Sequence, residues 1–209
     1  MHTVSVNLYA FGELASEVQR KVVERERFIN IDDSSWYEPI IGDWTEELQQ
    51  RGFENARILF SGFGSQGDGA CFEARINMAA YLAAHHLKAT YPLLAKYPEY
   101  TQVSLQHRGG IYYHERSTVL VPYFNAEAVN PNGSSISDEE TRVEKEYEAL
   151  EKDIYRESVR LGRHIYKALE DEFLHQISAE AIQDTLIANE YTYLSDGRCF
   201  TMPSSAYGR

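Results

Sequence analysis

The chain has 209 residues, with 20 Lys and Arg against 32 Asp and Glu, and a formal net charge of −12. This length and an apolar fraction of 43% suffice for a folded core, and they exclude a disordered chain. The negative charge disfavours non-specific binding to nucleic acid, because that binding depends on Lys and Arg contacts to phosphates.

Cysteine content and apolar patterning indicate the compartment. Two cysteines are too few for a disulfide framework or a thiolate zinc site. The N-terminal sequence lacks a basic segment followed by an apolar stretch, and no apolar run approaches the roughly 18 residues that a membrane span needs. These features predict a soluble, cytosolic protein.

The first elements in chain order are a strand and two helices. Residues 3–11 alternate apolar and polar side chains, which is typical of a half-buried strand. Amphipathic patterning predicts helices over 13–28 and 36–50, and Gly52 is well placed to end the second.

A β-hairpin from Arg57 to Asn77 is the most clearly predicted element. Its strands cover 58–63 and 70–76 and flank a glycine-rich turn, Gly64-Ser65-Gln66-Gly67-Asp68-Gly69. Period-two alternation places Phe72, Ala74 and Ile76 on the core face and Cys71, Glu73, Arg75 and Asn77 on a polar face.

Another helix and a second hairpin follow. The helix is predicted over 79–96. The hairpin has strands at 102–106 and 111–123, joined by a tight turn at Arg108-Gly109-Gly110, so that Tyr112, His114, Arg116 and Thr118 share one strand face. Residues 130–137 are polar and contain Pro131 and Gly133, which indicates a linker.

The remaining sequence is mainly helical. A near-heptad apolar stripe predicts one long amphipathic helix over 139–173, which permits packing onto the sheet or a homodimer. Ser178 caps a shorter helix to about residue 189, and 191–200 form a small strand.

The element order predicts an α+β fold with a small, mostly antiparallel sheet. The sheet is built from two hairpins plus an N-terminal strand, with helices on one face and a long C-terminal amphipathic helix. We expect residues 1–130 to form the α+β core, and residues 138–209 to form a helical part that packs on this core within a single domain.

A candidate ligand site combines polar side chains of the two hairpins. The proposed residues are Ser61, Gln66, Asp68, Glu73, Arg75, His107, Arg108, Tyr112, His114 and Arg116. The carboxylates and histidines suit acid–base work or a metal, whereas arginine, tyrosine and backbone amides suit a phosphate or carboxylate. Equally, Asp68 can serve its own turn, and the charged pairs can be solvated cross-strand partners.

Recognised enzyme signatures are absent. The sequence has no nucleophile elbow, no P-loop and no dinucleotide fingerprint that opens a helix. Cys71 is more simply a small buried side chain than a nucleophile. No cofactor and no bound metal are predicted.

The segment 58–73 resembles a family of small bacteriophage and mobile-element proteins that carry a Ser-x-x-x-Gln-Gly-Asp-Gly-Ala-Cys-Phe string. The similarity continues at Trp36-Tyr37-Glu38, Tyr112-Tyr113-His114-Glu115 and Ala188-Asn189-Glu190-Tyr191. Members are sometimes labelled antitoxin-like.

The resemblance implies a phage accessory protein in the host bacterial cytoplasm. We expect it to counter host immunity, by binding a defence protein or by sequestering a small nucleotide signal. The alternatives are a metal-assisted hydrolase that uses Asp68, Glu73, His107 and His114, and an antitoxin or acidic DNA mimic. Seven Lys and Arg between Arg142 and Lys167 argue against the mimic.

Overall fold

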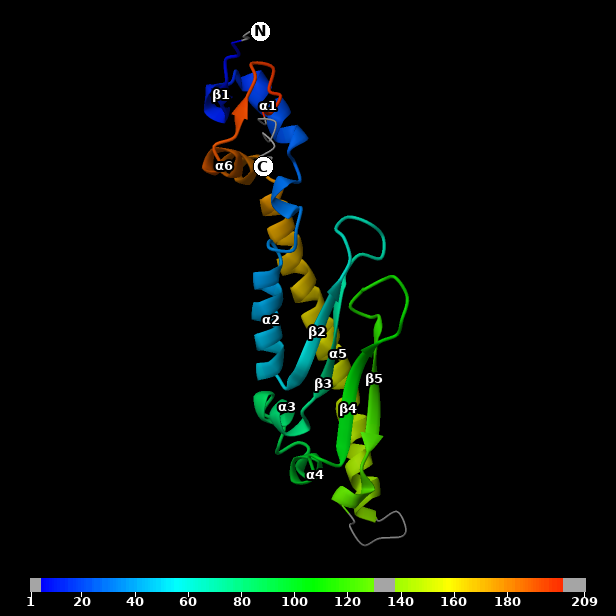
Figure 1. The fold of residues 1–209 in the computed structure, drawn as a ribbon. Coiled ribbons are helices and arrows are strands. Elements are labelled where there is room, and N and C mark those ends of the chain that lie inside the picture. Colours follow the sequence, from blue (N-terminus) through cyan, green and yellow to red (C-terminus); the bar gives the residue numbers. More distant parts are fainter. Residues whose placement is uncertain (1–4, 130–137, 201–209) are drawn as a thin grey trace, which may run out of the picture. The chain divides into compact units, whose positions relative to one another are not determined.

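A computed structural model describes residues 5–129 and 138–200 (Figure 1). The described chain forms two compact units. Unit 1 combines residues 5–37 with 171–200, and unit 2 is the continuous segment 38–170. This division differs from the predicted one, which separates the chain between residues 130 and 138; the predicted linker at 130–137 lies outside the described residues.

Unit 2 contains a four-stranded antiparallel sheet, which confirms the predicted α+β class. Its strands, in spatial order, are β2 (Phe53–Phe60), β3 (Ala70–Ile76), β4 (Thr101–His107) and β5 (Thr118–Phe124). Helix α2 (Glu38–Gln50) lies beside β2 and ends before Gly52, whose φ of +89° suits glycine (Figure 1).

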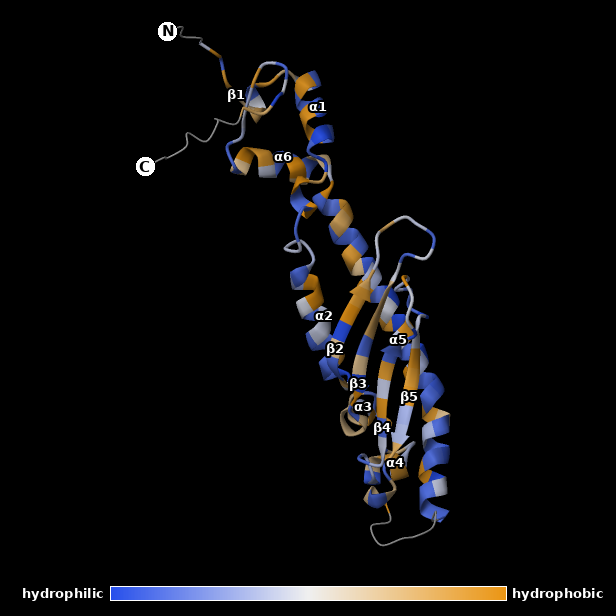
Figure 2. Ribbon diagram, turned by 45° about the vertical axis from the view of Figure 1, so that its right-hand side comes forward, coloured by the Kyte–Doolittle hydropathy of each residue, from blue (hydrophilic) through white to orange (hydrophobic). Residues whose placement is uncertain are grey.

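One long helix, α5 (Asp138–Gln176), confirms the predicted C-terminal amphipathic helix. Its apolar stripe, which includes Val143, Leu150 and Ile154, is fully buried. Tyr147 packs edge-on against Phe124 of β5, and Gly162 lies against the Ala70 carbonyl of β3. The stripe is therefore used within the chain, and the opposite side of α5 is hydrophilic (Figure 2).

The prediction of one helix over 79–96 is wrong. The structure has two short helices, α3 (Met78–Ala84) and α4 (Pro92–Lys96). Asn77 caps α3 by accepting the Ala80 N–H at 3.0 Å. The break follows because His86 has a φ of +56°, which a right-handed helix does not permit.

The second hairpin has a longer loop than predicted. Strand β5 begins at Thr118, so residues 111–117 are not a strand and the predicted shared face of Tyr112, His114 and Arg116 is wrong. The loop closes through hydrogen bonds from Arg108 N–H to the Ser117 carbonyl and from Ser117 N–H to the His114 carbonyl, both 2.8 Å. These bonds replace the ladder that a continuous strand would form.

The predicted core face of β3 is confirmed, since Phe72, Ala74 and Ile76 are buried. Cys71, predicted on the polar face, is also buried. The loop after β4 covers this end of the strand, as the contact of Gly69 with the His114 backbone shows.

Unit 1 is a small separate assembly. Its elements are β1 (Tyr9–Ala10), α1 (Ser16–Arg25), α6 (Ala179–Ala188) and β6 (Thr192–Tyr193), with 3₁₀ turns at Phe11–Glu13 and Ile29–Ile31. A third 3₁₀ turn, Ala126–Ala128, belongs to unit 2. The core of unit 1 is formed by Phe11, Leu14, Val22, Ile182, Leu186 and Tyr193.

The N-terminal strand therefore does not join the main sheet. It pairs antiparallel with β6, and of the described residues 5–11 only Tyr9 and Ala10 are strand; residues 5–8 are exposed, and residues 3 and 4 of the predicted strand lie outside the described part of the chain. Their alternation lacks a buried face to pack against. Ser178 caps α6, as predicted, by accepting the Ala181 N–H. Within the described residues, no helix is both long and apolar enough to cross a membrane.

Candidate functional site

The two hairpin loops of unit 2, residues 61–69 and 108–117, touch one another. A Cβ added at Gly67 would lie 2.7 Å from the Tyr112 ring, and one at Gly69 would lie 2.9 Å from His114 Cα. Only glycine fits at these two places. The glycine-rich string thus allows the second loop to lie directly on the first.

Polar groups of the first loop largely satisfy one another. Asp68 Oδ2 accepts the Ser65 N–H at 2.6 Å, and the Ser65 carbonyl accepts the Asp68 N–H at 3.2 Å. The Ser61 hydroxyl oxygen is buried without a hydrogen-bond partner among the described residues, whereas Gln66 is exposed. Asp68 therefore stabilises the backbone of its own turn, which is the alternative to a ligand-binding role that the sequence also allows.

His107 and Tyr112 are likewise held within the second loop. The His107 ring accepts the Gly109 N–H at Nδ1 (3.2 Å) and lies 2.9 Å from the Tyr112 carbonyl at Nε2. Since a carbonyl only accepts, Nε2 carries the proton and donates to it. Both ring nitrogens are occupied, which leaves no lone pair for a metal.

Glu73 joins the two hairpins. Its carboxylate accepts two hydrogen bonds from Arg57, at 2.6 and 3.0 Å, and the His107 N–H at 3.1 Å. The Arg57 hydrogen bonds hold the pKa of the Glu73 carboxyl below its usual value, against a smaller opposing effect of burial. Arg75 is exposed on the same strand.

His114 belongs to a chain of polar side-chain contacts that reaches α5. Its Nε2 lies 3.0 Å from Glu115 Oε2, and Glu115 Oε1 accepts the Arg163 Nε–H at 2.8 Å. The Glu115 side chain is only 12% exposed, so this pair fixes the second loop to the helix.

The ten predicted site residues thus do not converge on one point. Asp68, Glu73, His107 and His114 have separate local partners. Among residues 5–129 and 138–200, no group of three or more His, Cys, Asp or Glu is placed to hold a metal ion. Arg108 and Arg116 point to a different place.

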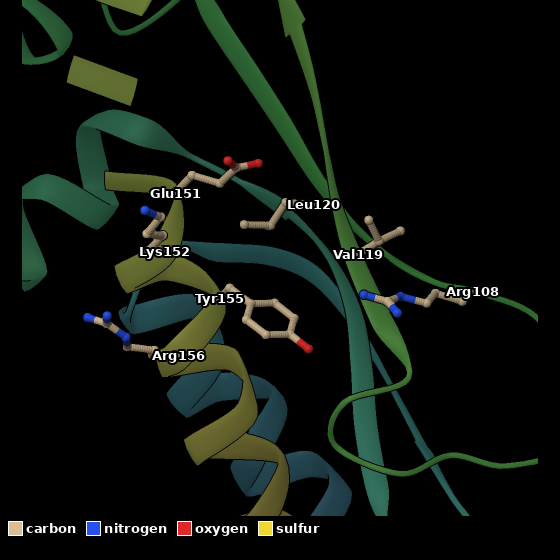
Figure 3. Close-up of a pocket in the computed structure, with 7 residues that line it drawn as sticks. All are labelled: Arg108, Val119, Leu120, Glu151, Lys152, Tyr155 and Arg156. Carbon is tan, nitrogen blue, oxygen red and sulfur yellow. The ribbon is translucent and has the colours of Figure 1, made fainter. Parts of the chain in front are cut away.

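That place is a surface groove along α5, which faces β5 at one end and the second loop at the other; we call it the basic groove. It consists of two adjoining hollows that share Tyr155 and Arg156. The first, of ≈ 350 Å³, is lined by Arg108, Val119, Leu120, Glu151, Lys152, Tyr155 and Arg156 (Figure 3). The second, of ≈ 470 Å³, is lined by Arg116, Tyr155, Arg156, Val159, Arg160 and Arg163.

Six of the chain's 20 Lys and Arg residues line the basic groove. Three of them pair with carboxylates: Arg156 with Asp153, Arg160 with Glu157 and Arg163 with Glu115. With Glu151, four carboxylates accompany six cations, which leaves two positive charges in excess in a chain of net charge −12.

The other three cations have no carboxylate within ion-pair distance in the described part of the chain. These are Arg108, Arg116 and Lys152. Arg108 donates from Nε to the Thr118 carbonyl at 3.0 Å, which leaves both terminal nitrogens for a ligand. Figure 3 shows the Tyr155 ring extending from α5 toward β5, on the side of the hollow where Arg108 lies.

The sequence prediction found only Arg108 and Arg116 of this groove. A signal for the rest was present: Lys152, Arg156, Arg160 and Arg163 follow steps of four, four and three, which place them on one helix side. The sequence does not say which strand edge lies opposite that side.

Cys71 is a structural residue. It is buried, and its burial raises the pKa of the thiol to about 12, with a further contribution from the nearby Glu73 carboxylate. A thiolate is the reactive form, so Cys71 is not suited to be a nucleophile.

Comparison with known proteins gives a family without an assigned activity. No curated protein and no solved structure matches this chain. The family model described as "Domain of unknown function (DUF8835)" matches residues 36–179, which cover unit 2 and hence both loops and the basic groove. The chain therefore belongs to the DUF8835 family.

Proposed function

We propose that this protein binds a small phosphate-bearing, nucleotide-like ligand in the basic groove and sequesters it without chemical change. In the phage or mobile-element setting that the sequence resemblance implies, such a protein acts in the bacterial host cytoplasm and removes a nucleotide signal of host immunity.

The observation that carries this proposal is the concentration of cations around one aromatic ring in an acidic protein. Guanidinium groups bind phosphate oxygens through paired N–H donors, and Tyr155 offers a face on which a base can stack. The unpaired cations Arg108, Arg116 and Lys152 can take up an anion without first losing a carboxylate partner.

The remaining alternatives have less support. The metal-assisted hydrolase needs Asp68, Glu73, His107 and His114 together, and each is engaged elsewhere. An acidic DNA mimic is disfavoured because α5 presents a basic stripe at Lys152, Arg156, Arg160 and Arg163. Binding of a defence protein is the other possible route to the same biological role.

The test is calorimetric titration with pyrophosphate, nucleoside mono- and diphosphates, cyclic dinucleotides and NAD-derived nucleotides. Arg116→Glu should weaken binding of the best ligand by about tenfold or more, because it removes one charge-assisted contact and adds a repulsive charge. Arg116 is exposed, so the fold should tolerate the change.

Lys145→Glu is the matched control. It makes the same charge change at an exposed position of α5 that does not line either hollow of the groove. If neither variant differs from the parent, or if no ligand binds, the groove is not the site. Recovery of the ligand in altered form would replace sequestration with catalysis.

A further inference from the structure

The two hollows of the basic groove differ in chemistry. The second is lined by four arginines, whereas the first has a mostly apolar wall of Val119, Leu120 and Tyr155. A phosphate suits the second and a flat, weakly polar ring system suits the first. The pair of hollows therefore matches a ligand that has both parts.

One carboxylate faces the apolar hollow. Glu151 is half-buried, and Figure 3 shows its carboxylate directed toward Leu120 of β5. Within the described residues it has no hydrogen bond and no ion-pair partner. A carboxylate in this position rejects acceptor groups of a ligand and favours a group with N–H donors.

The open edge of β5 adds backbone donors and acceptors. Along an antiparallel pair of strands, hydrogen-bonded and non-hydrogen-bonded residue pairs alternate. The hydrogen bond from Arg108 N–H to the Ser117 carbonyl shows which residue pairs of β4 and β5 are of each kind. By that alternation Leu120, which lies opposite Leu105, directs its N–H and C=O away from β4. Pro122 occupies the equivalent position two residues on, where its missing N–H costs no ladder bond.

The distance between the carboxylate and the arginines also selects the ligand size. Glu151 and Arg160 are nine residues apart on α5, which is about 13 Å along the helix axis. A free phosphate or pyrophosphate cannot reach both ends, whereas a nucleotide with an extended base and phosphate can.

We infer that the ligand is a guanine nucleotide, an inference that rests on the proposed function. The guanine Watson–Crick edge presents two adjacent N–H donors, for the Glu151 carboxylate, beside a carbonyl oxygen, for the Leu120 N–H. The base lies against Tyr155 in the first hollow, and its phosphate meets Arg116, Arg160 and Arg163 in the second. Adenine presents an acceptor where guanine presents a donor, so Glu151 discriminates against it.

Calorimetric titration of the full chain with GMP, AMP, UMP, CMP and pyrophosphate tests this inference. We expect GMP to bind at least tenfold more tightly than AMP. Glu151→Gln should reduce this ratio to about threefold or less, because one of the two acceptor oxygens becomes a donor, while pyrophosphate affinity stays the same or rises slightly.

Glu148→Gln is the control, since Glu148 is exposed on α5 and does not line either hollow. It should leave the ratio unchanged, and thermal unfolding of both variants verifies the fold. Equal affinity for the four nucleotides, or a ratio that Glu151→Gln does not alter, overturns the guanine assignment and leaves the proposed function standing. Failure of every nucleotide and of pyrophosphate to bind overturns both. Tighter binding of a single-stranded oligonucleotide than of any mononucleotide also overturns the assignment.

Discussion

The hairpin loops and the basic groove are both rich in polar side chains, but they differ in how those side chains are satisfied. In the first loop Asp68 has a partner within the chain, and so do Glu73 and His107 on the strands next to the loops. In the groove, Arg116 and Lys152 have no carboxylate partner within ion-pair distance among the described residues. A distinctive sequence string therefore marks packing between loops, whereas the plainer helical stripe supplies the surface that can take a ligand.

Cysteine labelling gives the largest expected effect. If the glycine-rich string is interior packing, Cys71 should react with a thiol reagent at least about a thousandfold more slowly than Cys199, which is exposed. The raised pKa of Cys71 lowers its thiolate fraction, and burial blocks access. Mass spectrometry of labelled peptides measures both rates. Rapid labelling of Cys71 in the folded protein contradicts the interior assignment.

Two helical glycines should respond to alanine with opposite signs. Gly162→Ala should lower the free energy of unfolding by about 2 kcal/mol, because its Cβ would lie 2.7 Å from the Ala70 carbonyl and 2.9 Å from Glu115 Cβ. Gly42→Ala should raise it by about 1 kcal/mol, since nothing lies within 4 Å there and alanine favours helix. Urea unfolding compares the two. A stabilising Gly162→Ala would show that α5 does not hold the loops so closely.

The first loop offers a finer comparison. Gly64 and Gly67 have φ values of +102° and +95°, so alanine strains the backbone at both. Only Gly67 meets a neighbour, the Tyr112 ring, and Gly67→Ala should cost about 1 kcal/mol more than Gly64→Ala. Tyr112→Ala in both backgrounds should abolish the difference. An unchanged difference would mean that the loops do not rest on one another.

The smallest effect is a pH dependence at Glu73. Its folded-state pKa is lowered by the Arg57 hydrogen bonds, so the stabilisation is present above the unfolded pKa of about 4.3 and is lost as pH falls through the lower folded value. Glu73→Gln should lower stability by about 1 kcal/mol or less at pH 7 and have a smaller effect near pH 3. Urea midpoints at the two pH values measure this. A constant difference would remove Glu73 ionisation as the cause.

The sequence predicts the parts of this protein that depend on local patterns. The hairpin around Gly64 to Gly69, the stop at Gly52, the cap at Ser178 and the long helix all follow from turn chemistry and periodicity. The strand predicted over 111–123 is wrong in its first part, 111–117, because the alternation of side chains there does not reveal the loop closure at Ser117. The groove is missed because its two walls, β5 and α5, are far apart in sequence.

The chain leaves unit 1 after residue 37 and returns to it at residue 171, and this order has a consequence for folding. Strand β1 cannot pair with β6, nor Val22 pack with Leu186, until the intervening 38–170 segment has been synthesised. Contacts of such sequence separation carry a loop-closure entropy and form late. During translation, residues 5–37 therefore lack their native contacts with residues 171–200 until those residues are synthesised. Unit 2 is a continuous segment and is expected to fold first.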